Sequence, residues 1–423
     1  MKLVQHIAIG FLFVSLFNLN VSSCAFAQGN PVQTTTVARI PMAKNSPHGT
    51  TEIVNLPLPI RTFDITGYVS VNAKGEIAIV EYRALLNSSG KFIVDSKGDG
   101  RIWNRIVLFD STGKQTQNIP LPARAEDNIS QILLCGDGSI WLNLTTRHYG
   151  YAIQKIDRTG KVLFEFGQSL NRKGSRQVSA SLRSKWTKLY HHRWGKKYEL
   201  DSVDDILTDD EGRVYLIIED QSLHIFSPAG KPVVAYALQR GDVGQIISQD
   251  YYTIGDGRRK AFHGRLQFID HAGQIYTSDF VLNKSNTDIV GYDIYRWNWL
   301  KDMKSELLGT VKDAGCVVGT DDRGNVYYST FPKHVVLRIA PGGVVTEVFN
   351  PVQHYAKWIA DERKKWLAGM SPSAYKRTLP YLAKHYNMGP RVGHICKVDA
   401  SGRLYVTLVG AKEFRVDRIT LGQ

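Results

Sequence analysis

The sequence predicts an all-β fold, a six-bladed β-propeller, and three observations lead to this prediction. A short phrase recurs six times: an apolar run, a tight turn that ends in Gly, a branched aliphatic residue and usually Tyr or Trp. Most copies are followed by a second pair of apolar segments with a turn of its own. The N-terminal part of the chain also matches a strand that the last repeat lacks. Six copies of one four-stranded unit are typical of a repeat architecture.

Each copy of the phrase predicts a β-hairpin. An Asp or Asn in the turn can bond its own backbone, and Gly supplies the positive φ that such a turn requires. Alternating apolar residues flank each turn, as expected for two half-buried strands. The six copies are residues 71–77, 135–141, 209–215, 270–276, 321–327 and 399–405.

The residues after each copy predict two more strands, which completes four strands per blade. The fourth unit departs from the pattern, and the sixth ends after its third strand, at residues 414–419. The clear examples are residues 105–114, 154–161, 223–231 and 337–343.

An N-terminal strand is predicted to complete the sixth blade. Residues 52–59 resemble residues 115–122, the last strand of blade one. Pairing them with the C-terminal blade closes the ring and removes two exposed sheet edges. The predicted domain boundaries are therefore a flexible N-terminal segment at residues 28–50 and a propeller at residues 51–423.

The phrase Asp-x-x-Gly-x-Val-Tyr, followed by an Arg-Ile or Lys-Ile strand and another Gly turn, resembles the NHL-type repeat. The resemblance extends over residues 51–420 and implies a six-bladed propeller related to gluconolactonases and streptogramin lyases. NHL repeats usually carry an Asp six residues after the turn Gly. In this chain only Asp279 matches that position and Glu81 approximates it. The resemblance therefore implies the architecture more than a function.

Residues 1–27 are predicted to be a signal peptide that is removed. Lys2 precedes an apolar stretch from Ile7 to Leu19, and Ala25-Phe26-Ala27 forms a small-residue cleavage pattern. The apolar stretch is too short for a membrane span. The mature chain is expected to be secreted or periplasmic. Lipid anchoring at Cys24, in a loose lipoprotein cleavage box, is the minor alternative.

The cysteines and the net charge bear on the class of function. Cys135, Cys316 and Cys396 are expected to be small packing residues on inner strands, and their odd number leaves at least one thiol outside any disulfide. No Cys-x-x-Cys or His-x-x-x-His spacing indicates a zinc site. The net charge of +14 favours acidic partners or surfaces. We expect a monomer.

A basic, aromatic insertion separates blades two and three, at residues 168–200. It contains no acidic residue from Gly167 to Tyr198, and its aromatic residues recur every fourth position, as on one side of a helix. The helix could pack its aromatic side on the propeller. Alternatively, it could be an arm that grips an anionic polymer, lipid headgroups or a sugar, with nucleic acid not expected as the partner. The arm would use Arg183, Lys185, Trp186, Lys188, Arg193 and Trp194.

A second insertion, residues 350–392, separates blades five and six. Residues 353–368 are predicted to form a helix that ends at Gly369, and Ser371-Pro372 begins another. Both insertions join an outer strand to the next inner strand, and such connections share the top face of a propeller. We expect a helical hairpin over the channel mouth, as a lid or packing element, or alternatively as a mobile gate or docking surface.

The beginnings of the inner strands predict a polar site at the channel mouth. Ser130, Asp204, Arg265 and His394 each lie eight residues before a turn Gly, and His263 lies beside Arg265. Propellers commonly bind ligands at this end of the channel. A carboxylate, a guanidinium and an imidazole around one axis could hold a polar ligand, although each could instead be a structural polar group.

Enzyme activity is the alternative to ligand or partner binding. A gluconolactonase-like metal site needs several oxygen ligands around a divalent cation, and only Asp204, with Asp205 and Glu81, is placed to supply them. A lyase-like mechanism needs a general base, for which His394 and His263 are candidates. Neither set is complete, so no metal or cofactor is predicted. An exported binding protein is favoured over a metal-assisted hydrolase or lyase, and a structural or interaction module of a cell-envelope assembly is the third hypothesis.

Overall fold

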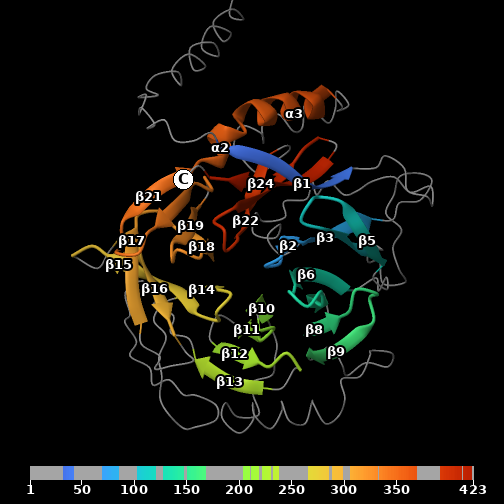
Figure 1. Cartoon of the computed structure of the whole chain (residues 1–423), viewed down its shortest axis with the longest axis horizontal. Coiled ribbons are helices and arrows are strands. Elements are labelled where there is room, and N and C mark those ends of the chain that lie inside the picture. Colours follow the sequence, from blue (N-terminus) through green and yellow to red (C-terminus); the bar gives the residue numbers. More distant parts are fainter. Residues whose placement is uncertain are drawn as a thin grey trace, which may run out of the picture.

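The computed structural model describes residues 32–41, 69–84, 102–120, 127–146, 150–167, 203–209, 211–218, 222–229, 232–237, 265–284, 288–298, 305–331, 333–368, 391–411 and 413–421. These residues form the strands β1 to β24 and the helices α2 and α3 (Figure 1).

The strands β2 to β17 form four sheets, each an antiparallel series of four strands that are consecutive in the chain. The first sheet contains β2 (Val69–Val71), β3 (Ile77–Ala84), β4 (Ile102–Phe109) and β5 (Gln115–Pro120). The second contains β6 (Asp127–Leu134), β7 (Ile140–Thr146), β8 (Gly150–Ile156) and β9 (Val162–Gly167). The third contains β10 (Val203–Thr208), β11 (Val214–Ile218), β12 (Ser222–Phe226) and β13 (Pro232–Ala237). The fourth contains β14 (Arg265–Ile269), β15 (Ile275–Leu282), β16 (Ile289–Trp297) and β17 (Ser305–Val311).

The other strands form one eight-stranded sheet made of two antiparallel groups. One group contains β18 (Gly315–Thr320), β19 (Val326–Thr330), β20 (Val336–Ile339) and β21 (Val345–Phe349). The other contains β22 (Arg391–Val398), β23 (Leu404–Val409), β24 (Glu413–Thr420) and the N-terminal β1 (Gln33–Pro41). The groups meet at one parallel pairing, Gly319 with Val398. A Cβ at Gly319 would lie only 2.3 Å from the Val398 carbonyl oxygen, so this contact requires glycine.

The first strand of each series lies nearest the centre of the molecule (Figure 1). These inner strands contact one another in turn: β2 with β6, β6 with β10, β10 with β14, β14 with β18, β18 with β22, and β22 with β2. Four-stranded antiparallel sheets arranged around a common centre are the architecture of a β-propeller. The predicted all-β class is confirmed.

The strand beside β24 is not the one that we expected. β1 pairs antiparallel with β24 from Gln33 opposite Thr420 to Pro41 opposite Glu413. Residues 33–41 fall in the segment that was expected to be flexible, and residues 52–59, expected at this edge, lie outside the described residues. Thr34, Thr35, Thr36 and Val37 form a β-branched run, which favours a strand. The likeness between residues 52–59 and another strand does not reflect this local propensity.

The first residue of the recurring turn stabilises the turn and anchors a tyrosine. The Asp209 Oδ1 accepts a hydrogen bond from the Arg213 N–H, and its Oδ2 accepts one from the Tyr215 hydroxyl at 2.7 Å. Burial and the neighbouring carboxylate raise the pKa of Tyr215 well above its ordinary value, so the hydroxyl keeps its proton. The same arrangement recurs at Asp270, Asp321 and Asp399.

The anchored tyrosine also contacts the turn of the next sheet. A Cβ at Gly273 would lie 2.8 Å from the Tyr215 hydroxyl oxygen, and one at Gly402 would lie 3.0 Å from that of Tyr327. Both glycines have a positive φ, which side chains disfavour. The recurring sequence motif therefore has a structural role, because the Tyr of one copy contacts the turn Gly of the copy in the next sheet.

The hydrophobic core lies between neighbouring sheets. Leu223 and Ile225 of β12 pack with Ile269 and Ile275 of the next sheet, and Trp297 joins them. Similar clusters join the first sheet to the second, the fourth to the β18–β21 group, and the β18–β21 group to β22–β24. Another cluster joins β1 and β24 to the first sheet. These clusters stabilise the fold by burying the faces of neighbouring sheets against each other.

The helices of the second insertion lie at the outer edge of the molecule. α2 (Pro351–His354) and α3 (Ala356–Ala368) lie beside β1, away from the centre (Figure 1). The helix expected at residues 353–368 is present from Ala356 as α3, with the short α2 before it, but these helices do not cover the channel mouth. The reason is a set of contacts to β1 and β24 that local helical periodicity does not reveal. The expected second helix, from Ser371 to His385, lies outside the described residues.

Among the described residues, none of the helices has both the length and the apolar character that crossing a bilayer requires.

Candidate functional site

Four of the five predicted site residues lie on inner strands. Ser130 is in β6, Asp204 in β10 and Arg265 in β14, and β10 contacts both β6 and β14. His394 is in β22, elsewhere around the ring. His263 lies outside the described residues. So do the residues of the predicted basic arm, Arg183, Lys185, Trp186, Lys188, Arg193 and Trp194.

Three of these residues lie at β-bulges. Ser130 falls between the paired residues Ile129 and Gln131, and Asp204 falls between Val203 and Asp205. His394 and Gly393 together face the single residue Thr407. A bulge leaves the extra residue without a partner in the ladder and redirects its side chain, and bulges are frequent next to binding sites. Arg265 differs, because it pairs regularly with Ser278.

Glycine next to His394 permits a close approach between β22 and β23. A Cβ at Gly393 would lie 2.3 Å from the Thr407 Oγ1, so a larger residue would require Thr407 to move. Gly393 therefore suits the irregular pairing of β22 with β23 at this point.

Glutamine side chains link neighbouring inner strands next to these bulges. The Ile206 N–H donates to the Gln131 Oε1 at 2.8 Å, and the Gln131 Nε2 donates to the Ile206 carbonyl at 3.0 Å. Gln267 makes the same pair of bonds to β18, accepting from the Val317 N–H at 2.9 Å and donating to the Gly315 carbonyl at 3.3 Å. Gln131 satisfies the backbone of β10, which is an edge strand in its sheet, and Gln267 bonds the backbone of β18 ahead of its pairing with β22.

Two further side chains link other pairs of inner strands, closer to the turns. The Leu134 N–H donates to the Ser70 Oγ at 2.9 Å, joining β6 to β2. The Lys397 Nζ donates to the Val71 carbonyl at 2.8 Å, joining β22 to β2. These polar groups have structural partners.

The glutamines, Ser70 and Lys397 were not among the residues predicted from the sequence. A signal existed at Gln131 and Gln267, since both are uncharged polar residues one or two positions after a predicted site residue. Their pairing with a neighbouring backbone depends on how the sheets are placed, which the sequence does not state.

A partly buried guanidinium lies at the beginning of an inner strand, and a partly buried imidazole lies on a loop. Arg391 begins β22, three residues before His394, and burial lowers the pKa of its guanidinium. His334, between β19 and β20, adopts a φ of 55°, and its Nδ1 is buried without a hydrogen-bond partner in the described part of the chain. Burial lowers the pKa of His334, so its neutral form is favoured.

The described residues contain no group of three or more His, Cys, Asp or Glu side chains arranged to hold a metal ion.

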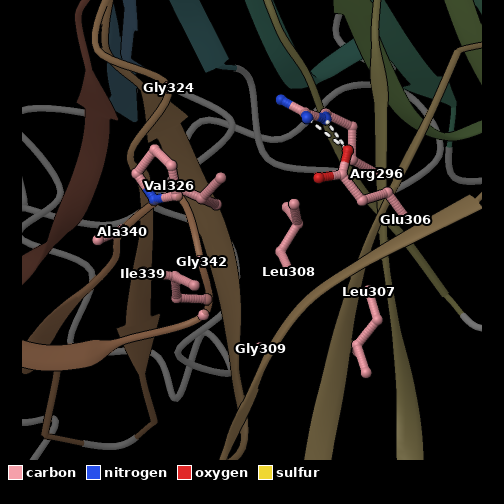
Figure 2. A pocket seen from close by; sticks show the side chains of 12 residues that line it. Arg296, Glu306, Leu307, Leu308, Gly309, Gly324, Val326, Ile339, Ala340 and Gly342 are labelled. Atoms are coloured by element: carbon pink, nitrogen blue, oxygen red, sulfur yellow. Dashed lines mark hydrogen bonds and ion pairs between the residues drawn. The ribbon is translucent and has the colours of Figure 1, made fainter.

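A groove of about 410 Å³ lies elsewhere, between β17 and the turns of the next sheet. Leu307, Leu308, Ile339 and Pro341 supply apolar lining, together with glycines of two turns. Figure 2 shows Leu308 between the Val326 side of the groove and the ion pair of Arg296 with Glu306. Because Gly324 of the recurring turn lines it, the groove lies at the opposite end of the strands from the predicted site.

Comparison with known proteins identifies no family for this chain. No family model matches it. No curated protein matches it either. Similar solved structures include a catalytically inactive virginiamycin B lyase from Staphylococcus aureus with quinupristin, at 11% identity over 92% of this chain and 99% of that chain, with a TM-score of 0.38.

Two other similar structures have different names. BamB from Moraxella catarrhalis is 13% identical over 91% of this chain and all of that chain, with a TM-score of 0.35. The WD40 beta propeller domain of Doa1 is 9% identical over 92% of this chain and 94% of that chain, with a TM-score of 0.34. Similarities at this level carry no argument about function.

Proposed function

We propose that this chain is an exported, six-bladed β-propeller of the NHL-like type that binds an anionic ligand or partner at the mouth of its central channel. The proposed contacts are Ser130, Asp204, Arg265, His394 and His263. The observation that carries the proposal is the set of bulges at Ser130, Asp204 and His394, because polar residues at bulges on inner strands are free of the regular ladder.

The six-bladed arrangement is supported by the contacts between inner strands, which lead from β2 through β22 and back to β2. The Lys397 Nζ donates to the Val71 carbonyl across the last of these contacts. Closure by an N-terminal strand is supported by the pairing of β1 with β24. A closed ring leaves no open end between sheets at which another chain could pair and aggregate.

The charge of the chain supports an anionic ligand. The net charge is +14, and two arginines, Arg265 and Arg391, begin inner strands. Arginine binds carboxylate and phosphate groups through paired N–H donors. In this proposal Asp204 and His394 orient the ligand by hydrogen bonds, and the basic residues Arg183, Lys185, Lys188 and Arg193, with Trp186 and Trp194, extend the site toward a longer anionic polymer.

The test is a thermal-shift screen of the chain from residue 28 onward with polyphosphate, sulfated and uronic-acid oligosaccharides, lactones and divalent cations. A ligand that binds the native state raises the apparent melting temperature with the logarithm of its excess concentration. We expect an anionic oligomer to give the largest shift, and we expect added salt to reduce it.

Site variants and matched controls then locate the binding. Arg265→Gln, Asp204→Asn and His394→Gln change the proposed contacts. Exposed residues on the opposite turns supply the same changes as controls: Arg323→Gln, Asp322→Asn and His271→Gln. We expect Arg265→Gln to weaken binding about tenfold, the usual effect of losing a charged hydrogen bond, while the controls bind as the parent chain does. Equal binding by all six variants, or a shift with cations alone, would contradict the proposal.

A further inference from the structure

A fully buried carboxylate joins three parts of the chain that are far apart in sequence. Asp417 of β24 has no exposed surface. Its Oδ1 accepts a hydrogen bond from the Thr36 hydroxyl of β1 at 2.9 Å. Its Oδ2 accepts one from the hydroxyl of Tyr355, the residue between α2 and α3, at 3.0 Å. The Arg415 Nη2 lies 3.1 Å from the same oxygen.

A buried carboxylate is strongly destabilising when its partners are lost. Tyr355 is 4% exposed, and burial next to Asp417 raises the pKa of its hydroxyl, which therefore stays a hydrogen-bond donor. Lifting the helices from the sheet would leave Asp417 with one donor fewer. Moving β1 away from β24 would remove the Thr36 donor. The two movements are coupled through one side chain.

Further contacts hold the helices on the same sheet. Glu362 of α3 is 7% exposed and accepts a hydrogen bond from the Ala411 N–H at 2.7 Å. A Cβ at Gly410 would lie 2.9 Å from the Glu362 Oε2, so this approach suits glycine. The Arg415 guanidinium lies over the Trp358 ring, with its carbon 4.8 Å from the ring centre, which is a cation–π contact.

The helices also contact β1 directly. The Thr34 Oγ1 and the His354 Nε2 lie 3.0 Å apart, within hydrogen-bond distance. Among the described strands, β1 is the outermost of its sheet and pairs with β24. Outer strands near a chain end are usually the first to open, because few contacts hold them. Here, helices inserted between β21 and β22 supply contacts that such a strand normally lacks.

We propose that α2 and α3 form a clasp that holds β1 on β24, with Asp417 as the shared anchor of the helices and the strand. In this arrangement β1 leaves the sheet only when the helices also lift. The role of the second insertion is thus to control the closing strand of the propeller. It acts at the rim of the molecule, away from the channel.

The test is hydrogen exchange of the β1 amides in the chain from residue 28 onward. Tyr355→Phe removes only the hydroxyl that reaches Asp417. Tyr276→Phe is the matched control, since it removes a hydroxyl that donates to the buried Asp270 at 2.9 Å in a separate sheet. We expect Tyr355→Phe to speed exchange in Gln33–Pro41 about tenfold and Tyr276→Phe to leave it nearly unchanged, because one hydrogen bond to a charged group is lost in each case but only one of them touches the clasp.

A second variant keeps the test decisive if Tyr355→Phe does not fold. Glu362→Ala removes the contact to Ala411 and leaves Asp417 intact. We expect it too to speed exchange in β1, although Glu362 touches neither β1 nor Asp417 in the described contacts. The clasp is ruled out if β1 exchanges at the parent rate in the folded helix variants, or no faster than in Tyr276→Phe. A double variant, Thr36→Val with Tyr355→Phe, should cost less than the two single losses added together, because both donors act on one carboxylate.

Discussion

Tyr405 of the last group of strands lies against Gly75 in the turn of the first sheet. A Cβ at Gly75 would be 3.1 Å from the Tyr405 hydroxyl oxygen, and the same hydroxyl donates a hydrogen bond to the Asp399 Oδ2 at 3.2 Å. The same Tyr-to-Gly contact that joins neighbouring sheets elsewhere therefore joins the two ends of the series.

The first prediction concerns this contact. Gly75 and Gly324 have the same φ of +77°, but the nearest atom to a Cβ at Gly324 is Pro341 Cγ at 3.6 Å. Gly324→Ala should lower the free energy of unfolding by about 1 kcal/mol, the backbone cost alone. Gly75→Ala should lower it by about 1–2 kcal/mol more, because Tyr405 must move. Urea denaturation measures both, and equal losses would refute the Tyr405 contact.

Removing the ammonium group of Lys397 should weaken the contact between β22 and β2. The Lys397 Nζ donates to the Val71 carbonyl, which Lys397→Met leaves without this donor. We expect the free energy of unfolding to fall by about 1–3 kcal/mol, as for loss of a charged hydrogen bond. Lys161→Met, at an exposed turn position, is the control and should change it by less than about 0.5 kcal/mol. Comparable effects of both variants would show that the Val71 bond is unimportant.

Truncating Gln131 should separate the edges of β6 and β10. Gln131→Ala removes both hydrogen bonds to Ile206, and we expect a loss of about 2 kcal/mol because a backbone N–H and a carbonyl lose their partners together. Hydrogen exchange should show the Ile206 amide exchanging faster than other β10 amides. Gln115→Ala on the outer strand β5, where the side chain is exposed, should do neither. A protected Ile206 amide in Gln131→Ala would be inconsistent with this role.

Acid should destabilise the fold through His224. Burial lowers the pKa of this histidine from 6.5 to about 3. Below pH 6.5 the unfolded chain binds a proton at this position while the native His224 stays neutral, so the contribution lost in acid approaches about 1.4 kcal/mol per pH unit until the native group titrates. His224→Met should flatten the stability profile between pH 6.5 and about pH 4.5 relative to the parent chain. Exposed His271→Gln should leave the slope as it is, and an unchanged slope in His224→Met would exclude this source.

The hairpins could be predicted from the sequence because the residues that form each turn are close together in the chain. Asp209, Gly212 and Tyr215 are six residues apart at most, and the turn depends on bonds among such neighbours. The helix at residues 353–368 followed from its own periodicity in the same way. Its position did not, because the partner of Tyr355 is Asp417, 62 residues further along the chain.

The candidate site was predicted only in outline. Counting eight residues back from each turn Gly correctly placed the candidate residues on inner strands. The bulges could not be predicted in this way, because a bulge depends on how one strand pairs with another. Ser130 and His394 carry no sequence mark that distinguishes a bulge from a regular position. Gln267 is an extra residue of β14 whose side chain pairs with the backbone of β18, and that partner is set by packing between sheets. For β1, the β-branched run from Thr34 to Val37 was a usable signal.

The pairing of β1 with β24 constrains the order of events during synthesis. Thr36 and Asp417 are 381 residues apart, so β1 emerges from the ribosome long before its partner exists. Until β24 and the helices before it have been made, Thr34 to Ile40 have no sheet to join. A nascent chain that stops short of Glu413 would therefore carry an unpaired strand at one end and an incomplete sheet at the other. Chaperones and proteases would act on the chain in this incomplete state.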